Sequence, residues 1–184
     1  MMKFLYSLKH SRYWLEEKAN ALTETAILIP VFLTLLMGVY DLGTAIIVNQ
    51  KSITSSQVVA DLIARNKELD LDTVNDIVRA GRMALEPYDT IDYGYDIVSL
   101  QFDIDGNETI LWRVTENMNP NDDAIQSAVD ILQLTNDGLV IVTTAFGYTP
   151  YFAEFITDDI EMQEVSFVQG RRTPFIECDD CPAG

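Results

Sequence analysis

The longest apolar segment of the chain covers residues 25–48, TAILIPVFLTLLMGVYDLGTAIIV. Its length matches the hydrocarbon core of a bilayer, which about 20 residues of α-helix span. Two acidic residues mark it: Glu24 stands just before it and Asp41 lies well inside it. A carboxylate at the centre of a membrane helix costs about 2.5–3.5 kcal/mol on insertion scales, so each is expected to have a partner or a function.

Helical periodicity continues beyond the apolar segment. Residues 49–66 contain no Gly or Pro, and their apolar residues recur at helical spacing: Val58, Val59, Leu62 and Ile63. The pattern predicts one long helix. A second helix is predicted after a short turn, with Asp72 as its cap and Pro87 ending it; its apolar face consists of Val74, Ile77, Val78 and Leu85.

From residue 96 the apolar period changes from helical to two. Residues 98–104 and 110–114 alternate on either side of Asp105-Gly106-Asn107, which predicts a β-hairpin. A short helix is expected over residues 124–132. An apolar strand over residues 139–148 should lie centrally in a sheet, and a last strand should cover residues 160–168.

These elements predict an α+β fold in which a long N-terminal transmembrane helix extends into a small extracytoplasmic domain with an antiparallel sheet. We expect a leader (residues 1–19), the transmembrane helix and its extension (residues 20–66), an α+β domain (residues 67–176) and a Cys-containing tail (residues 177–184). The leader has two interpretations: a disordered tail whose Tyr13 and Trp14 rest at the membrane interface, or a peptide recognised by a processing enzyme.

The formal charge of −17 is distributed unevenly. Residues 1–50 carry four basic and four acidic residues, so the whole excess belongs to residues 51–184. Such an acidic domain repels nucleic acid, and a nucleic-acid partner is not expected. The four basic residues precede the apolar segment, which favours a cytoplasmic N-terminus and a periplasmic C-terminal domain. The segment is longer than the 7–15 apolar residues of a signal peptide, which favours a retained anchor.

Residues 19–62 resemble a known family. A small residue, four spacers, Glu24 and a long apolar helix resemble the N-terminus of type IV pilins and pseudopilins. More closely, the segment is similar to the TadE/TadF-like family of tight-adherence (Flp) pilus assembly proteins. The matching residues are Glu24, Ala26, Pro30, Leu33, Gly38, Asp41 and Gly43, and the string FGYTP (residues 146–150) adds a looser match.

The resemblance implies a non-catalytic, pilin-like inner-membrane subunit whose partners are other pilus-assembly subunits. It also implies processing between Ala19 and Asn20 by a prepilin peptidase, although pilins usually have Gly where this chain has Ala19. Glu24 would then pair with the new N-terminal amine of a neighbouring subunit; alternatively it is simply solvated at the interface. Pro30 is expected to kink the helix. Asp41 could reach outward to water or pair with another subunit.

Little in the chain indicates catalysis. The single His, His10, lies in the leader, and no phosphate-binding loop, dinucleotide motif or G-x-S-x-G motif occurs. We therefore expect no enzyme, no cofactor and no metal. The string DIDGN (residues 103–107) fits a calcium loop poorly, because the sixth and twelfth places hold Glu108 and Val114.

Cys178 and Cys181 form a C-x-x-C pair near the C-terminus. A disulfide is the simplest expectation in an oxidising compartment; a redox pair, a metal site shared between chains and free thiols are the alternatives. Two rival functions stay open beside the pilin-like one. One is a membrane-anchored adaptor or binding domain of another envelope system, and the other is a redox protein that uses the two cysteines.

Overall fold

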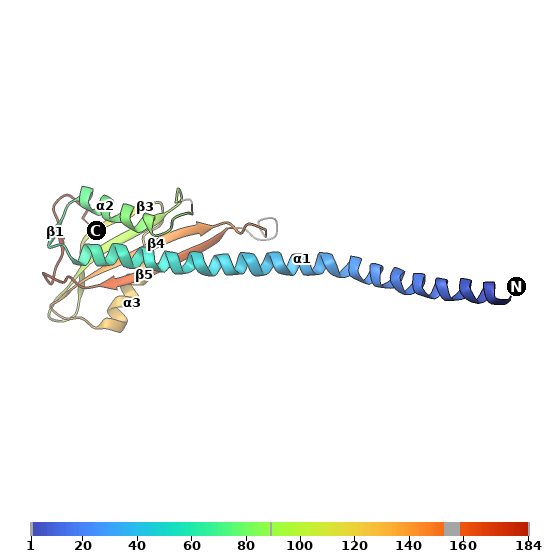
Figure 1. The fold of residues 1–184 in the computed structure, drawn as a ribbon. Helices are drawn as coiled ribbons and strands as arrows, with labels where there is room; N and C mark the ends of the chain where they lie inside the picture. The colour runs from blue at the N-terminus through green and yellow to red at the C-terminus, as the bar shows by residue number, and fades with distance from the viewer. Residues whose placement is uncertain (1, 89, 153–158, 184) are drawn as a thin grey trace.

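The computed structural model describes residues 2–88, 90–152 and 159–183, and their side chains from residue 21 onward. One helix, α1 (Met2–Ala64), forms a third of the chain. Figure 1 shows its C-terminal part packed on a small domain and its N-terminal part projecting far from it. The long helix predicted for residues 20–66 is confirmed to within two residues at its C-terminal end. The leader from Met2 onward belongs to the same helix, and its two interpretations stay open.

The domain is built on a four-stranded sheet in the order β3-β2-β4-β5, with antiparallel pairing between all neighbours. The strands are β2 (Gly94–Phe102), β3 (Glu108–Glu116), β4 (Gly138–Tyr148) and β5 (Ile160–Val168). The predicted hairpin is β2–β3, and β4 is central as its apolar sequence indicated. The α+β class with one long apolar N-terminal helix is therefore confirmed.

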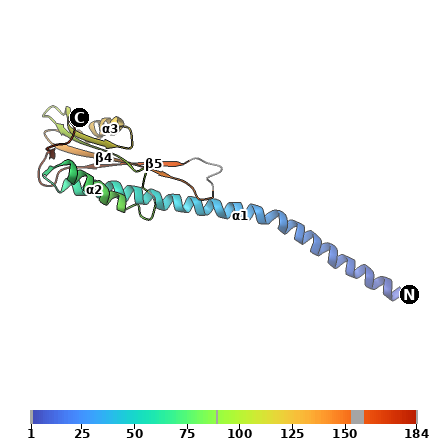
Figure 2. The same cartoon turned by 90° about the horizontal axis from the view of Figure 1, so that it is seen from above.

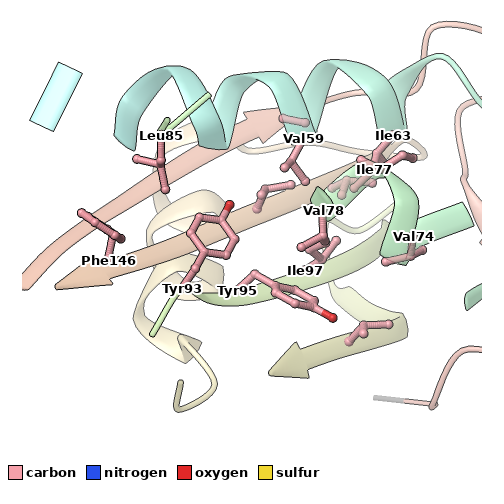
Figure 3. Close-up of a cluster of buried hydrophobic side chains, with 14 of the residues drawn as sticks. Val59, Ile63, Val74, Ile77, Val78, Leu85, Tyr93, Tyr95, Ile97 and Phe146 are labelled. Atoms are coloured by element: carbon pink, nitrogen blue, oxygen red, sulfur yellow. The ribbon is translucent and has the colours of Figure 1, made fainter. Parts of the chain in front are cut away.

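Helices cover both faces of the sheet. α1 and α2 (Leu71–Met83) lie on one face, and α3 (Asp122–Leu132) lies on the other, as the view from above makes clear (Figure 2). Because side chains alternate along a strand, β2 and β4 supply both cores. The α1–α2 core includes Val59, Ile63, Val78, Tyr93, Tyr95, Ile97 and Phe146 (Figure 3). The core beneath α3 includes Val98, Leu100, Phe102, Ile125, Ala128 and Ile141.

Small residues bring α1 and α2 close together. The Ser55 hydroxyl donates to the Gly81 carbonyl at 2.8 Å, and a Cβ atom at Gly81 would lie only 2.4 Å from the Val59 side chain. The start of α2 differs from the prediction, because Asp70, not Asp72, is the N-cap and accepts from the Thr73 amide at 2.7 Å. Asp72 lies in the first turn, where its negative charge interacts favourably with the helix dipole and stabilises the helix.

The C-terminal segment is part of the domain. β6 (Glu177–Cys178) pairs in parallel with β1 (Glu68–Leu69), a two-residue ladder that the sequence did not predict. Ile176 is 1% exposed, and its carbonyl accepts from Trp112 Nε1 at 2.8 Å and from Ser99 Oγ at 3.1 Å. The expected Cys-containing tail is therefore part of the domain and begins beside the sheet, next to Ser99 of β2 and Trp112 of β3.

Candidate functional site

The exposed half of α1 is apolar on every side. The part Ala21–Ala64 is long and apolar enough to cross a membrane. Most of its large apolar side chains are exposed on the isolated chain. They include Ile27, Val31, Phe32, Leu35, Leu36, Val39, Leu42, Ile46 and Ile47. A helix that is apolar all round requires an apolar environment around it.

The domain-facing half of α1 has a narrower buried stripe. Five side chains three or four residues apart are fully buried: Val48, Ser52, Ser55, Val59 and Ile63. This spacing places them on one side of the helix. The change at Val48 divides α1 into a projecting segment and a segment that is part of the domain core.

The predicted N-terminal site residues lie within the projecting segment, 24 or more residues before Val48. Ala19 and Asn20 lie within α1, but their side chains fall outside the described part of the chain. Glu24 is exposed, and no bond to it is found among the described side chains. A single chain therefore leaves both interpretations of Glu24 open, since the proposed amine belongs to a neighbouring subunit.

Pro30 lies inside α1, and the helix continues on both sides of it. Figure 2 shows α1 bent in its blue, N-terminal half, beyond the part that packs on the domain. Proline is the commonest cause of sharp bends in helices, because its nitrogen cannot donate and its ring displaces the preceding turn.

Asp41 has the most distinctive environment of the predicted residues. Its side chain is 5% exposed, and its carboxylate accepts from the Phe152 amide at 3.0 and 3.2 Å and from the Tyr151 amide at 3.2 Å. The expectation that Asp41 reaches outward to water is therefore wrong. Tyr151 and Phe152, which follow β4, lie over it, so residues about 110 positions apart are in contact.

An aromatic cluster surrounds this contact. The Tyr40 and Phe152 rings meet edge to face at 5.5 Å, and the Tyr151 and Phe152 rings do so at 5.2 Å. Sequence reasoning noted the FGYTP string but missed Tyr151 and Phe152. The available signal was two consecutive aromatic residues directly after Pro150, in a position where a hairpin loop usually carries polar residues.

Cys178 and Cys181 are joined by a disulfide. Their sulfur atoms and an Asp180 carboxylate oxygen lie within 4.8 Å of one another. A disulfide offers no thiolate, which is the form of cysteine that binds metals, so this group is not a metal site in the oxidised protein. The pair lies at the β1–β6 end of the domain, and Figure 1 shows β1 at the opposite end of the molecule from the projecting part of α1.

The DIDGN string forms a turn closed by its own aspartate. The Asp103 carboxylate accepts from the amides of Asp105 and Asn107 and from the Asn107 side chain, each at 2.8 Å. These bonds, those from Asn107 first, hold the pKa of Asp103 below its ordinary value. Gly106 has a φ of +84°, a conformation that favours glycine. The carboxylate thus has a structural role in the hairpin.

The domain contains a buried ion pair that was not predicted from the sequence. Asp96 on β2 is 1% exposed and takes two bonds from Arg113 on β3, Nε–Oδ1 at 2.9 Å and Nη2–Oδ2 at 2.7 Å. Burial by itself would raise the pKa of Asp96, but bonds from Arg113, the Asn121 amide and Thr115 outweigh it and lower the pKa. Arg113 also contacts Asp122 at the start of α3, so the pair ties α3 to the sheet.

Comparisons with protein-family models, with curated proteins and with solved structures gave no match.

Proposed function

We propose that this chain is a non-catalytic, pilin-like minor subunit of tight-adherence (Flp) pilus assembly, anchored in the bacterial inner membrane by α1. The observation that carries the proposal is the division of α1 at Val48. An exposed apolar segment with Glu24 near its start continues without interruption into a segment packed on an antiparallel sheet. The residues that resemble the TadE/TadF-like pattern lie mostly on this segment.

In this proposal the N-terminus is cytoplasmic and the acidic domain is periplasmic. The four Lys and Arg residues that precede the apolar segment support this orientation. An oxidising periplasm also suits the Cys178–Cys181 disulfide.

Glu24 provides the assembly contact in this proposal. It is an exposed carboxylate at the start of an apolar helix surface, where a charge is costly unless it is paired or hydrated. Cleavage after Ala19 would leave Asn20 with a free amine, four residues from Glu24 along the chain. In a bundle of such helices the amine of one subunit pairs with Glu24 of the next, and low dielectric strengthens the attraction.

The experiment compares Glu24→Gln with a matched control, Glu108→Gln, in cells that make pili. Both changes remove one exposed carboxylate at nearly constant size, but Glu108 lies on the domain at the start of β3. We expect Glu24→Gln to insert normally and to abolish surface pili at equal protein level. Glu108→Gln should assemble like the wild type.

Mass spectrometry of the mature chain is the second readout. A terminus at Asn20 supports the proposal. If cells with Glu24→Gln made pili at the wild-type level and the mature chain kept its leader, the proposed function would be refuted. The membrane-anchored adaptor would then be favoured.

A further inference from the structure

The described residues that follow β4 lie beside the projecting segment of α1. Figure 1 shows β4 and β5 running along α1 toward its N-terminal half, and the described end of β4 continues into residues 149–152, here named the tip segment. Its two aromatic residues contact α1 at Tyr40 and Asp41. The domain therefore touches α1 inside the apolar segment, seven residues before Val48.

This contact lies at the depth of the periplasmic boundary of the inner membrane, whose outer leaflet faces the periplasm. Seven residues of helix correspond to about 10 Å, so Asp41 lies about 10 Å toward the cytoplasm from Val48. Leu42, Ile46 and Ile47 lie between these two levels and are more than half exposed on the isolated chain. If they are covered by lipid, the tip segment lies within the outer leaflet or at its surface. This step rests on the membrane anchoring of the proposed function.

The surface that the tip segment forms with α1 is apolar. Leu33, Leu36, Met37 and Tyr40 of the helix and Tyr151 and Phe152 of the tip line a hollow of about 480 Å³ that is open to the outside. The hollow continues directly into the exposed apolar side of α1, whose Leu36 is 66% exposed. Tyr151, at 76%, is the most exposed aromatic residue around it. Aromatic side chains are enriched at the boundary between headgroups and acyl chains.

Asp41 supplies acceptors for the two backbone amides of the tip segment that lie beside α1. Backbone amides that face hydrocarbon without an acceptor are costly, and irregular backbone is tolerated at that depth only where protein satisfies it. The Asp41 carboxylate accepts from both the Tyr151 and the Phe152 amide. The same bonds give the carboxylate a partner within its own chain.

We propose that the tip segment is a second membrane contact, in which Tyr151 and Phe152 enter the outer leaflet and acyl chains fill the hollow beside Leu36. Asp41 holds the tip in place. The domain then contacts the membrane at two points, α1 and the tip segment, which restricts its rotation about the axis of α1.

The test uses spin labels on the full chain in phosphatidylethanolamine–phosphatidylglycerol nanodiscs. Each label is attached to one introduced cysteine, at Tyr151, at Leu36 as the lipid reference or at Ile104 as the water reference, in chains whose Cys178 and Cys181 are replaced by serine. Ile104 is 80% exposed and lies in the β2–β3 turn. Collision rates with oxygen, which concentrates in lipid, and with a nickel chelate, which stays in water, are measured at each site. We expect the oxygen-to-nickel ratio at residue 151 to exceed that at residue 104 several-fold and to approach that at residue 36.

The outcomes separate this inference from the proposed function. If the oxygen-to-nickel ratio is high at residue 36, as in lipid, but low at residue 151, as in water, the second membrane contact is overturned and the anchoring by α1 is not. Low collision rates with both reagents at residue 151 indicate a protein neighbour and also overturn it. A water-like label at Leu36 overturns the membrane anchoring itself.

Hydroxyl-radical footprinting repeats the test on the native sequence. Tyr151 and Ile104 are similarly exposed on the isolated chain, so after correction for intrinsic reactivity they should be oxidised alike unless lipid covers one of them. We expect several-fold protection of Tyr151 in nanodiscs. Equal oxidation of the two residues would overturn the proposal.

Discussion

Replacing Arg113 with methionine removes the counter-charge of a carboxylate that has almost no contact with water. Asp96 is 1% exposed and Arg113 is 14% exposed in their side chains. Removing one partner of a buried ion pair typically costs about 3–5 kcal/mol, because the other charge stays buried. Thr115 and the Asn121 amide still donate to Asp96, so we expect a loss near the lower end, about 3 kcal/mol.

The assay is urea unfolding of the full chain in detergent micelles, in a Trp14→Phe background that leaves the buried Trp112 as the only tryptophan. Arg79→Met is the matched control. Arg79 and Asp76 are 3.8 Å apart and both largely exposed, so this change should leave the free energy of unfolding within about 0.5 kcal/mol. The double variant Asp96→Asn/Arg113→Met should recover part of the loss, since no charge is left unpaired.

The effect of pH follows from the lowered pKa of Asp96. In the wild type this group stabilises the fold above its unfolded-state pKa of about 3.9, and the contribution is lost as pH falls through the lower folded-state pKa. Without Arg113, burial raises the pKa of Asp96, and protonation relieves the unpaired charge. The difference in stability between wild type and Arg113→Met should therefore narrow from neutral pH toward about pH 4. A loss equal to that of Arg79→Met, or a difference independent of pH, would refute the reasoning.

Two further changes probe the base of the domain by the same unfolding assay. Gly138→Ala should destabilise by about 1–3 kcal/mol, because its Cβ would lie 2.0 Å from the Pro174 carbonyl oxygen. Gly147→Ala, on the same strand, should be neutral, because among the described residues no atom other than those of its chain neighbours lies within 4 Å of the new Cβ; equal effects of the two changes would contradict the close approach. Cys178→Ser/Cys181→Ser should stay folded and lose no more than about 2 kcal/mol, since the disulfide closes a very short loop. The bonds to the Ile176 carbonyl still hold the segment, so loss of the fold would show that the disulfide is the main restraint.

The local pattern of the sequence determined most of the elements. Helical periodicity after Val48 predicted the extension of α1, and alternation around Asp105-Gly106-Asn107 predicted the β2–β3 hairpin. The apolar sequence of β4 predicted its central place, because a strand paired on both sides and covered by helices on both faces has few solvated positions. Such features depend on residues close together in the chain.

Contacts between distant residues were decided by the tertiary structure. The β1–β6 ladder has two residues per strand, too few to form a pattern, and Asp96 and Arg113 meet only because of the register of β2 on β3. Asp41 shows the difference most clearly. Its position in an apolar helix marked it as a residue with a partner or a function, but its orientation and its partners depend on where Tyr151 and Phe152 lie, about 110 residues later. The sequence determines the energetic problem of a buried charge, whereas only the packed chain determines which donors solve it.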